Sequence, residues 1–530
     1  MATAADQDAM LDAFLQPMTI DVEKCHALSR GFLQTFLRLS AESLHQFLPT
    51  PISESILRPV TENGRGRYLA IDIGGTNLRV GFVELHSRRN RASELANTTK
   101  INGTNGSHTG SSMPCHLERH LEKSWPISNQ LKSDNADSLF LWIGGCIAEV
   151  VEQGCKTLEL STSTPLPLGI TFSFPVEQPS LEKAIITSMG KGFAIPPKID
   201  LGARLEAAYE KHRGNRLPQI RVAAIANDSV ATLVSFIFNH SGVAQRRATM
   251  GLILGTGSNA TIPIRPSRLH PSKRPQKVTT LRNGVMEDAK IAVNTEWSIN
   301  GSAPPMRDLG LISSWDDELS AQNEKPGFQP LEYMTAGRYL GELGRLMLLD
   351  YMTNNLGIAS TSLPCKMLEQ FGLTTKFLGQ FKPPGAVGLL TKLRDEFGTS
   401  ADADFAWTEH HAHALHRIAK SIERRAAGLI AAAILALLTL GDELPAEDQP
   451  AYPNTGSETL ELGVGYTGGC IVHFQDYLTD CQGFLDELIH KRFGTQSRVR
   501  VVLSPCHDGG ISGAGILAAA ASAAALVNPA

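Results

Sequence analysis

Apolar residues along the chain fall into short continuous runs that alternate with longer stretches of helical period. The short runs are bounded by glycine or polar residues and predict strands, whereas the helical spacing predicts amphipathic or buried helices. Strand-like runs cover 68–73, 79–85, 166–175, 251–262 and 499–505, helical periods cover 21–48, 139–152, 331–440 and 512–527, and a strand followed by a helix covers 222–238. Strands that alternate with helices predict an α/β fold whose ligands bind at strand ends.

Three stretches carry more specific expectations. The first helical stretch places Leu28, Phe32 and Leu39 on one face, and we expect it to end before Pro49. The longest apolar run, 426–440, is shorter than the roughly 20 residues that a bilayer-spanning helix needs, so it predicts a buried core helix. Residues 87–114 are rich in Asn, Thr, Gly and Ser without an apolar period, which predicts a disordered surface insertion.

The size and composition of the chain narrow the classes of function. A chain of 530 residues is long enough for more than one lobe. Its 49 basic and 53 acidic residues give no reason to expect a nucleic-acid partner. The 8 cysteines form no closely spaced pair, so we expect reduced thiols. The first residues carry acids and no long apolar segment, so we expect no secretory signal, no transmembrane segment and a cytoplasmic location.

The segment LAIDIGGTNLRV raises the first question of chemistry, because a strand-like run carries an acid and then ends in two glycines. Gly74 and Gly75 let the backbone N–H groups of a hairpin turn face an anion, and Thr76 and Asn77 add side-chain donors. Asp72, near the end of the strand, is placed to hold a phosphate-bound Mg²⁺ through water. An ordinary β-turn with a capping acid is the alternative interpretation of this segment alone.

A second glycine turn favours the phosphate interpretation. It follows another apolar strand and consists of Gly255, Thr256, Gly257, Ser258 and Asn259. Two phosphate-holding turns on two separate β units describe a nucleotide held between lobes.

Asn227 and Asp228 stand between the apolar run VAAIA and the apolar helix SVATLV. A carboxylate in that position is partly desolvated, which raises its proton affinity and suits a general base that takes a proton from a hydroxyl. A helix N-cap is the structural alternative, and it is compatible with the same role.

Further polar residues give weaker signals. Ser173 stands at a strand end, and Lys191 lies between two glycines, where a lysine can reach a phosphoryl group or a sugar hydroxyl; an exposed turn lysine is the alternative. Glu296 and Glu332 are isolated acids near apolar segments. The histidines of HHAHALH, 410–416, have no Cys or carboxylate at metal-ligand spacing and predict a solvated helix face.

Taken in order, these motifs resemble those of the hexokinase family, in the superfamily of actin-like ATPases and sugar kinases. LAIDIGGTNLRV resembles the first phosphate motif, TFSFP and GKGF the sugar-binding segments, AIANDSVATL the catalytic motif and LILGTGSNA the second phosphate motif. VNTEW, QPLEYMTAGRYLGELGRL and the final SGAG helix extend the resemblance across 21–527. It implies a two-lobed actin-like, ribonuclease H-like α/β fold with a central cleft. It also implies transfer of the γ-phosphoryl group of MgATP to the 6-hydroxyl of a hexose.

The resemblance further implies roles and lobes. The catalytic residues are Asp228, as the base, and Lys191. The sugar is held by Ser173, Lys191, Asn227, Asp228, Asn259, Glu296 and Glu332. ATP is held by Asp72 (through Mg²⁺ and water), Gly74, Gly75, Thr76, Asn77, Arg79, Gly255, Thr256, Gly257, Ser258, Gly468, Gly513 and Gly515. The small lobe is 67–226, the large lobe comprises 227–511 with an N-terminal helical part at 1–66, and the last helix, 512–530, returns to the small lobe.

Departures from the glucose-using hexokinases narrow the resemblance. Gly190 precedes Lys191 where those enzymes usually have Thr, and GYTGG and HDGGISGAG stand in place of their usual Asp-Gly turns. Together with ITFSFP, these features resemble the hexokinase-like N-acetylglucosamine kinases of fungi, which implies amino-sugar catabolism. A glucose or mannose hexokinase of glycolysis is the alternative substrate reading, and a catalytically inactive hexokinase-like regulator is the alternative from another class. Asp228, Lys191 and both glycine turns are intact, which favours an enzyme.

Overall fold

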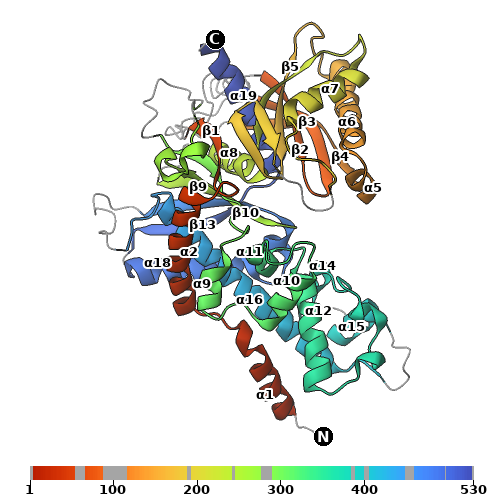
Figure 1. Ribbon diagram of the computed structural model, residues 1–530, viewed down its shortest axis with the longest axis vertical. Coiled ribbons are helices and arrows are strands. Elements are labelled where there is room, and N and C mark those ends of the chain that lie inside the picture. Colours follow the sequence, from red (N-terminus) through yellow and green to blue (C-terminus); the bar gives the residue numbers. More distant parts are fainter. Residues whose placement is uncertain are drawn as a thin grey trace, which may run out of the picture.

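The structure is a computed structural model of the chain, and Figure 1 shows its two lobes one above the other. It describes residues 4–53, 66–86, 116–187, 193–240, 245–275, 278, 289–383, 388–398, 405–447, 459–495 and 497–527. The predicted insertion at 87–114 and the predicted sugar-loop residues Gly190 and Lys191 lie outside the described residues.

The first lobe is built on a five-stranded sheet in the order β4-β3-β2-β5-β8. Its strands are β2 (Gly66–Ile73), β3 (Asn77–His86), β4 (His116–Pro126), β5 (Leu166–Phe172) and β8 (Ile220–Ala226). β2 and β3 form an antiparallel hairpin that β4 extends, while β5 and β8 join in parallel. Alternate residues of β2 face opposite sides, so that Leu69 and Ile71 enter one core and Tyr68 and Ala70 enter another.

The second lobe repeats this strand order with one strand added at the edge: β1-β11-β10-β9-β12-β13. The strands are β1 (Leu48–Ser53), β9 (Arg246–Leu254), β10 (Ser258–Ile264), β11 (Ile291–Asn294), β12 (Leu460–Thr467) and β13 (Val499–Pro505). Here too an antiparallel hairpin, β9 with β10, lies beside two parallel strands. Each glycine turn is therefore the tip of the equivalent hairpin in its own sheet, and residues of both tips line the same cavity.

Helices cover both faces of the first sheet. α6 (Ala136–Thr157) and α7 (Leu201–Arg213) pack together on one face. On the other face lies the last helix, α19 (Gly509–Val527), which packs against β2, β5 and β8 and against α8 (Asp228–His240). Figure 1 shows α19, at the blue end of the chain, among the first-lobe strands. A Cβ at Gly169 would lie 2.0 Å from the carbonyl oxygen of Ala514, so this packing brings helix and strand backbones into close contact.

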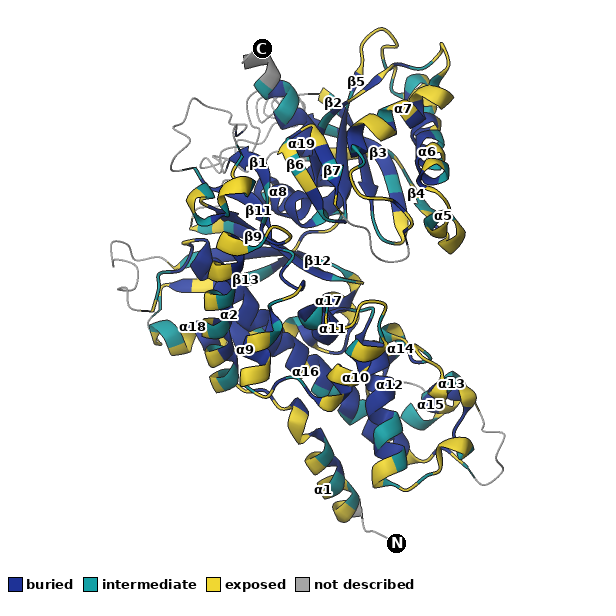
Figure 2. Ribbon diagram, in the orientation of Figure 1, coloured by how far each residue is buried: buried dark blue, intermediate teal, exposed yellow. Residues whose placement is uncertain are grey.

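The second lobe has a long buried helix, α16 (Glu409–Leu440), at its centre. Figure 2 shows most of this helix in the colour of buried residues. The predicted core helix at 426–440 is thereby confirmed, and within the described residues no helix combines the length and apolar character needed to cross a membrane. Other helices are α1 (Ala4–Leu15), α2 (Val22–Glu42), α5 (Asn129–Ser133), α9 (Ala303–Asp308), α10 (Ser314–Gln322), α11 (Pro330–Thr335), α12 (Leu340–Asp350), α13 (Cys365–Leu368), α14 (Thr375–Gln380), α15 (Leu389–Phe397), α17 (Gly469–His473) and α18 (Tyr477–Phe493).

Two local expectations need correction. The first predicted helix ends at Glu42 rather than near Leu48, and Pro49 instead lies in β1, at the edge of the second sheet. An edge strand tolerates proline because the missing N–H need not complete a ladder. The stretch 1–66, predicted as helical, therefore contributes a strand as well.

The histidine stretch is also not a fully solvated face, since His411 is buried and its Nδ1 accepts the backbone N–H of Thr408, which caps α16.

Candidate active site

The first glycine turn closes the β2–β3 hairpin, and backbone hydrogen bonds hold it in place. Gly74 donates its N–H to the carbonyl of Asn77 at 3.0 Å, and Ile127 donates its N–H to the carbonyl of Thr76 at 2.8 Å. The second bond fixes the segment after β4 against the tip of the turn. The first glycine turn is therefore joined to the segment that links β4 to the short helix α5.

Asp72 lies at the centre of an ion network behind this turn. Its Oδ2 accepts hydrogen bonds from Nη2 and Nε of Arg79, at 2.6 and 3.2 Å. Arg79 also contacts Asp508 with Nη1 at 2.7 Å, and the second oxygen of Asp508 lies 2.8 Å from Nη1 of Arg119. The network joins the hairpin to the residue that precedes α19.

Burial and charge act in opposite directions on the two acids of this network. Burial raises the pKa of Asp72, because desolvation outweighs the neighbouring charge of Arg79, and the charge of Asp228 raises it further. Burial would also raise the pKa of Asp508, but the charges of Arg119 and Arg79 prevail and lower it. Asp72 and Asp228 are therefore close enough to repel each other, which a bound cation would relieve.

The surroundings of Asp72 fit a hydrated Mg²⁺. A Cβ at Gly510 would lie 2.6 Å from Oδ2 of Asp72, so glycine lets α19 approach this oxygen closely, and both hydrogen bonds from Arg79 also go to Oδ2 rather than to Oδ1. Carboxylate oxygens are the ligands that Mg²⁺ prefers, and the ion keeps most of its waters. Among the described residues no group of three His, Cys, Asp or Glu side chains gathers into a protein-only metal site, so most ligands would have to be water and phosphate.

A cluster of buried amide side chains lies at the N-terminus of α8. Asn227 accepts the backbone N–H and the hydroxyl of Ser229 at 3.0 and 2.7 Å. Nδ2 of Asn259 donates to Oδ1 of Asn294 at 2.8 Å and to Oε1 of Glu296 at 3.3 Å. The cluster holds these side chains in fixed directions, as a site for a polar ligand requires.

Glu296 is held in an unusual backbone conformation by the same cluster. Its φ angle is 45°, in the left-handed region that residues with a Cβ rarely adopt. Its N–H donates to Oδ1 of Asn259 at 3.1 Å, and its Oε1 accepts from Nδ2 of Asn294 at 2.9 Å. Strain that is maintained by two directed side chains is typical of functional sites.

Asp228 is the first residue of α8. One carboxylate oxygen accepts the N–H of Ser229 at 2.9 Å, as expected of an acid at a helix N-terminus. The hydroxyl of Ser229 in turn lies 2.6 Å from that of Thr261 on β10, so the base of α8 is joined to the second sheet. Asp228 therefore sits where the two lobes meet.

Asp228, Asn259 and Glu296 line one cavity of about 310 Å³. Its acids include Asp228, Glu296 and the buried Glu332, whose Oε2 accepts the N–H of Ser258 at 2.9 Å. The remaining lining comes from both glycine turns, the end of β9, the segment after β5, α5, the segment between β11 and α11, α11 itself and the residues that follow it: Gly75, Thr76, Lys132, Ser173, Phe174, Pro175, Ile253, Thr256, Gly257, Ser258, Asn259, Ile299, Asn323, Glu324, Lys325, Phe328, Gln329, Tyr333, Arg338 and Tyr339.

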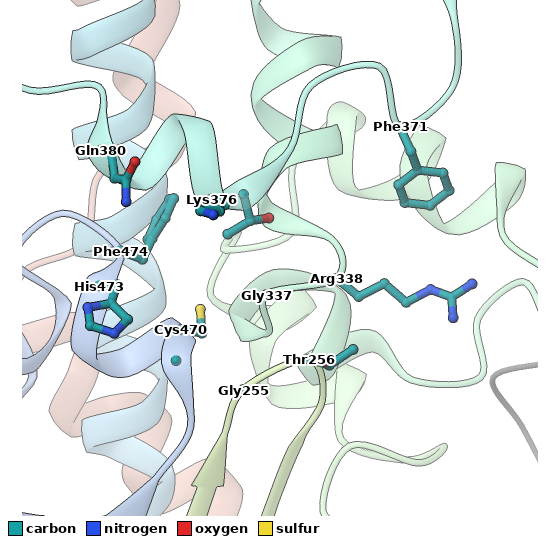
Figure 3. A pocket seen from close by; sticks show the side chains of 12 residues that line it. Gly255, Thr256, Gly337, Arg338, Phe371, Lys376, Gln380, Cys470, His473 and Phe474 are labelled. Atoms are coloured by element: carbon teal, nitrogen blue, oxygen red, sulfur yellow. The ribbon is translucent and has the colours of Figure 1, made fainter. Parts of the chain in front are cut away.

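A second cavity of about 610 Å³ lies on the other side of the β9–β10 turn, and Figure 3 shows its lining. Three of the residues that line it are glycines, namely Gly255, Gly337 and Gly469. A Cβ at Gly337 would lie 2.8 Å from the carbonyl oxygen of Gly255, and Gly255 lies against Gly468, whose φ is 127°. Thr256 and Arg338 line both cavities, so the two cavities meet at these residues.

The structure brings most of the sequence-predicted residues together. Ser173, Asp228, Asn259, Glu296 and Glu332 line the smaller cavity, together with five of the predicted phosphate-turn residues, Gly75, Thr76, Thr256, Gly257 and Ser258. Asn227 lies beneath them in the amide cluster, and Asp72 and Arg79 lie behind the first turn.

Two predicted glycines have a packing reason that the sequence did not reveal. A Cβ at Gly513 would lie 2.1 Å from the carbonyl oxygen of Ala231, and one at Gly515 would lie 2.3 Å from Cβ of Val83. Both therefore allow α19 to approach α8 and β3.

Several residues that line the smaller cavity were not predicted from the sequence. Lys132 lies in a helix of one turn, and Arg338 lies inside a longer helical motif, so neither stands out by local pattern. Glu324 and Gln329 belong to a loop whose direction depends on tertiary contacts.

Comparisons with known proteins agree with this geometry. Two family models described as hexokinase match residues 10–238 and 249–520. Hexokinase-2 of Solanum tuberosum is 26% identical and aligns with 88% of this chain and 81% of its own length. Glucokinase of Aspergillus niger is 26% identical and aligns with 86% of each chain.

Solved structures show the same fold. The hexokinase of Schistosoma mansoni complexed with glucose has a TM-score of 0.73 at 20% identity, with 98% of this chain and 100% of that chain covered. The two-lobed actin-like α/β fold is thus confirmed. Members of this family are sugar phosphotransferases that use ATP with Mg²⁺, and together the two models span nearly the whole chain. The chain belongs to the hexokinase family and is a sugar kinase of that type.

Proposed function

We propose that this protein transfers the γ-phosphoryl group of MgATP to the 6-hydroxyl of N-acetylglucosamine and yields N-acetylglucosamine 6-phosphate. The observation that carries the transfer is the shared cavity, in which Asp228, Asn259, Glu296 and Glu332 face the tips of both glycine turns. A polyhydroxylated ligand needs several fixed acceptors, and a phosphoryl donor needs backbone N–H groups close by.

In this proposal Asp228 removes the proton of the sugar 6-hydroxyl as that oxygen bonds to phosphorus. The bond between the γ-phosphorus and the bridging oxygen breaks, and ADP leaves with that oxygen. Asn259, Glu296 and Glu332 hold the other hydroxyls, and the larger cavity takes the nucleoside. Bound Mg²⁺, held by the phosphates and through water by Asp72, would supply charge neutralisation.

The choice of an amino sugar rests on sequence features. Gly190 before Lys191, GYTGG, ISGAG and ITFSFP resemble the fungal N-acetylglucosamine kinases. A glycine in the sugar loop removes a side chain, which leaves room for a substituent larger than a hydroxyl. Amino-sugar catabolism is the corresponding metabolic setting.

A glucose or mannose hexokinase is the second candidate. It is favoured by the relatives, which are named hexokinase or glucokinase, and by a similar solved structure that is complexed with glucose. The cavity's acids would serve either sugar, because the hydroxyls that they would hold are common to both.

The deciding experiment is ADP release by the purified protein with MgATP and N-acetylglucosamine, glucose, mannose or no sugar. A kcat/KM for N-acetylglucosamine well above that for the hexoses supports the proposal. A preference for glucose or mannose replaces it with the second candidate, and the absence of turnover with every sugar removes both.

A further inference from the structure

The short helix α5 places a cation in the smaller cavity that the catalytic scheme above does not use. α5 follows β4 and lies at the lower end of the first lobe (Figure 1). Lys132, in its last turn, is half-buried and lines the cavity together with Gly75, Thr76, Ser173 and Asp228.

Backbone hydrogen bonds join α5 and the residues before it to the first glycine turn on one side and to Ala194 on the other. On one side, Ile127 donates to the carbonyl of Thr76 at 2.8 Å. On the other, Ala194, just after the residues of the sugar loop, donates to the carbonyl of Lys132 at 2.7 Å. Ser128 caps the helix, since its hydroxyl accepts the N–H of Leu131 at 3.2 Å. The position of Lys132 is thus coupled to both ligand-holding segments.

Aromatic contacts direct the Lys132 side chain. Its Nζ lies 5.4 Å from the centre of the Phe193 ring, and that ring meets the Phe174 ring edge-on at 5.0 Å. Phe174 itself lines the cavity beside Ser173. A cation is attracted to the face of an aromatic ring, so the Phe193 ring holds the Lys132 ammonium group beside the cavity that Lys132 lines.

We propose that Lys132 binds the phosphoryl group during transfer and the phosphate of the sugar 6-phosphate product. The inference rests on the proposed phosphoryl transfer but not on the identity of the sugar. The transferred group spreads negative charge over its equatorial oxygens, and a flexible point charge next to the phosphate turn neutralises it. The acids of the cavity serve the sugar hydroxyls, whereas Lys132 lies next to the turn that faces phosphate.

The test compares three variants of the full chain with the wild type. Lys132→Met removes the charge and keeps the length of the stem, Lys132→Arg keeps the charge, and Lys123→Met is the matched control. Lys123 is a half-buried lysine on β4 that pairs with Glu149 at 2.9 Å, outside the cavity lining. Steady-state kinetics and equilibrium binding of the sugar and of its 6-phosphate are measured for each.

We expect Lys132→Met to lower kcat by about 10- to 100-fold and to weaken binding of the sugar 6-phosphate about 10-fold, with little change in binding of the free sugar. Lys132→Arg should recover most of the activity, and Lys123→Met should match the wild type. Preserved binding of the free sugar also shows that the Lys132→Met variant is folded; if it is not, Lys132→Gln takes its place.

Two results would overturn the assignment while leaving the kinase function intact. One is an active wild type with an equally active Lys132→Met variant. The other is a loss of affinity for N-acetylglucosamine alone, with glucose unaffected, which would make Lys132 a contact for the acetamide. A wild type that phosphorylates no sugar refutes the proposed function itself, so the two failures are distinguishable.

Discussion

Asp72 and Arg79 face each other across the β2–β3 hairpin, and two nitrogens of the Arg79 guanidinium donate to the same oxygen of Asp72, at 2.6 and 3.2 Å. The pair holds a buried acid directly behind a turn that we propose to face phosphate. Because Arg79 also contacts Asp508, the start of α19 is part of the same arrangement.

Replacement of Asp228 by Ala should abolish phosphoryl transfer and leave the fold intact. Asp228 is the cavity acid at the N-terminus of α8, and a positioned general base contributes about 100-fold or more to the rate. The measurement is ADP release together with thermal unfolding. Asp228→Asn preserves size and the contact with Ser229 and serves as the matched variant. Appreciable turnover by either folded variant would exclude Asp228 as the base.

Replacement of Gly510 by Ala should impair activity through Asp72. The new Cβ would lie 2.6 Å from Oδ2 and 2.8 Å from Cγ of Asp72, so either the carboxylate or α19 must move. We expect kcat/KM for MgATP to fall about 10-fold and the free energy of unfolding to fall by about 1–3 kcal/mol. The control is Gly483→Ala in α18, where a Cβ meets nothing within 4 Å. That control should gain about 0.5–1 kcal/mol, as alanine does in a helix. Equal behaviour of the two variants would refute the contact.

Adjacent glycines at 468 and 469 should respond differently to alanine. Gly468 has a φ of 127°, and its Cβ would lie 2.3 Å from the backbone carbonyl of Leu254, whereas a Cβ at Gly469 meets only His473, at 3.9 Å. We expect Gly468→Ala to lose about 1–3 kcal/mol of stability. It should also raise KM for MgATP, because the new Cβ would displace Gly255, which lines the larger cavity. Gly469→Ala should keep the unfolding temperature of the wild type. Unfolding curves of both variants decide, and a stable Gly468→Ala variant would contradict the geometry.

His411 should make stability depend on pH on the acid side. Burial, with a smaller contribution from the charge of His410, lowers the pKa of His411 to about 4. The unfolded chain has the ordinary value of about 6.5 and so binds more protons between these limits. Stability is complete above about pH 6.5 and is lost as the pH falls through about 4, by about 3 kcal/mol from this residue.

The measurement for His411 is the unfolding free energy from pH 7 to pH 4 for the wild type and for His411→Gln. The variant keeps an acceptor for the cap at Thr408 and should show a flatter profile. Identical slopes would show that His411 is not the group responsible.

Local signals were sufficient to predict much of the fold. Both glycine turns, the strand 499–505 and the helix that follows Asp228 lie where the sequence placed them, because each depends on residues close in the chain. Most of the predicted sugar ligands also meet in one cavity, and two of them, Ser173 and Asp228, follow neighbouring parallel strands whose carboxyl ends lie at one edge of the sheet.

Other features depend on contacts that sequence spacing does not encode. β1 forms because it pairs with β11, a partner far along the chain, so the prolines that looked like helix terminators became part of an edge strand. Asp508 and Arg119 meet only after α19 has folded against the first sheet. Lys132 was missed because the direction of a one-turn helix is set by tertiary contacts.

The position of α19 has a consequence for the order in which the protein can mature. The strands of the first sheet emerge from the ribosome long before residues 509–527, which cover one of their two faces. Until then an apolar surface that includes Ala70, Val83 and Ala224 has no covering helix. Exposed surface of this kind is a target for chaperones and for aggregation. A chain whose synthesis stops before α19 would therefore have a first lobe that needs protection, although its sheet is already complete.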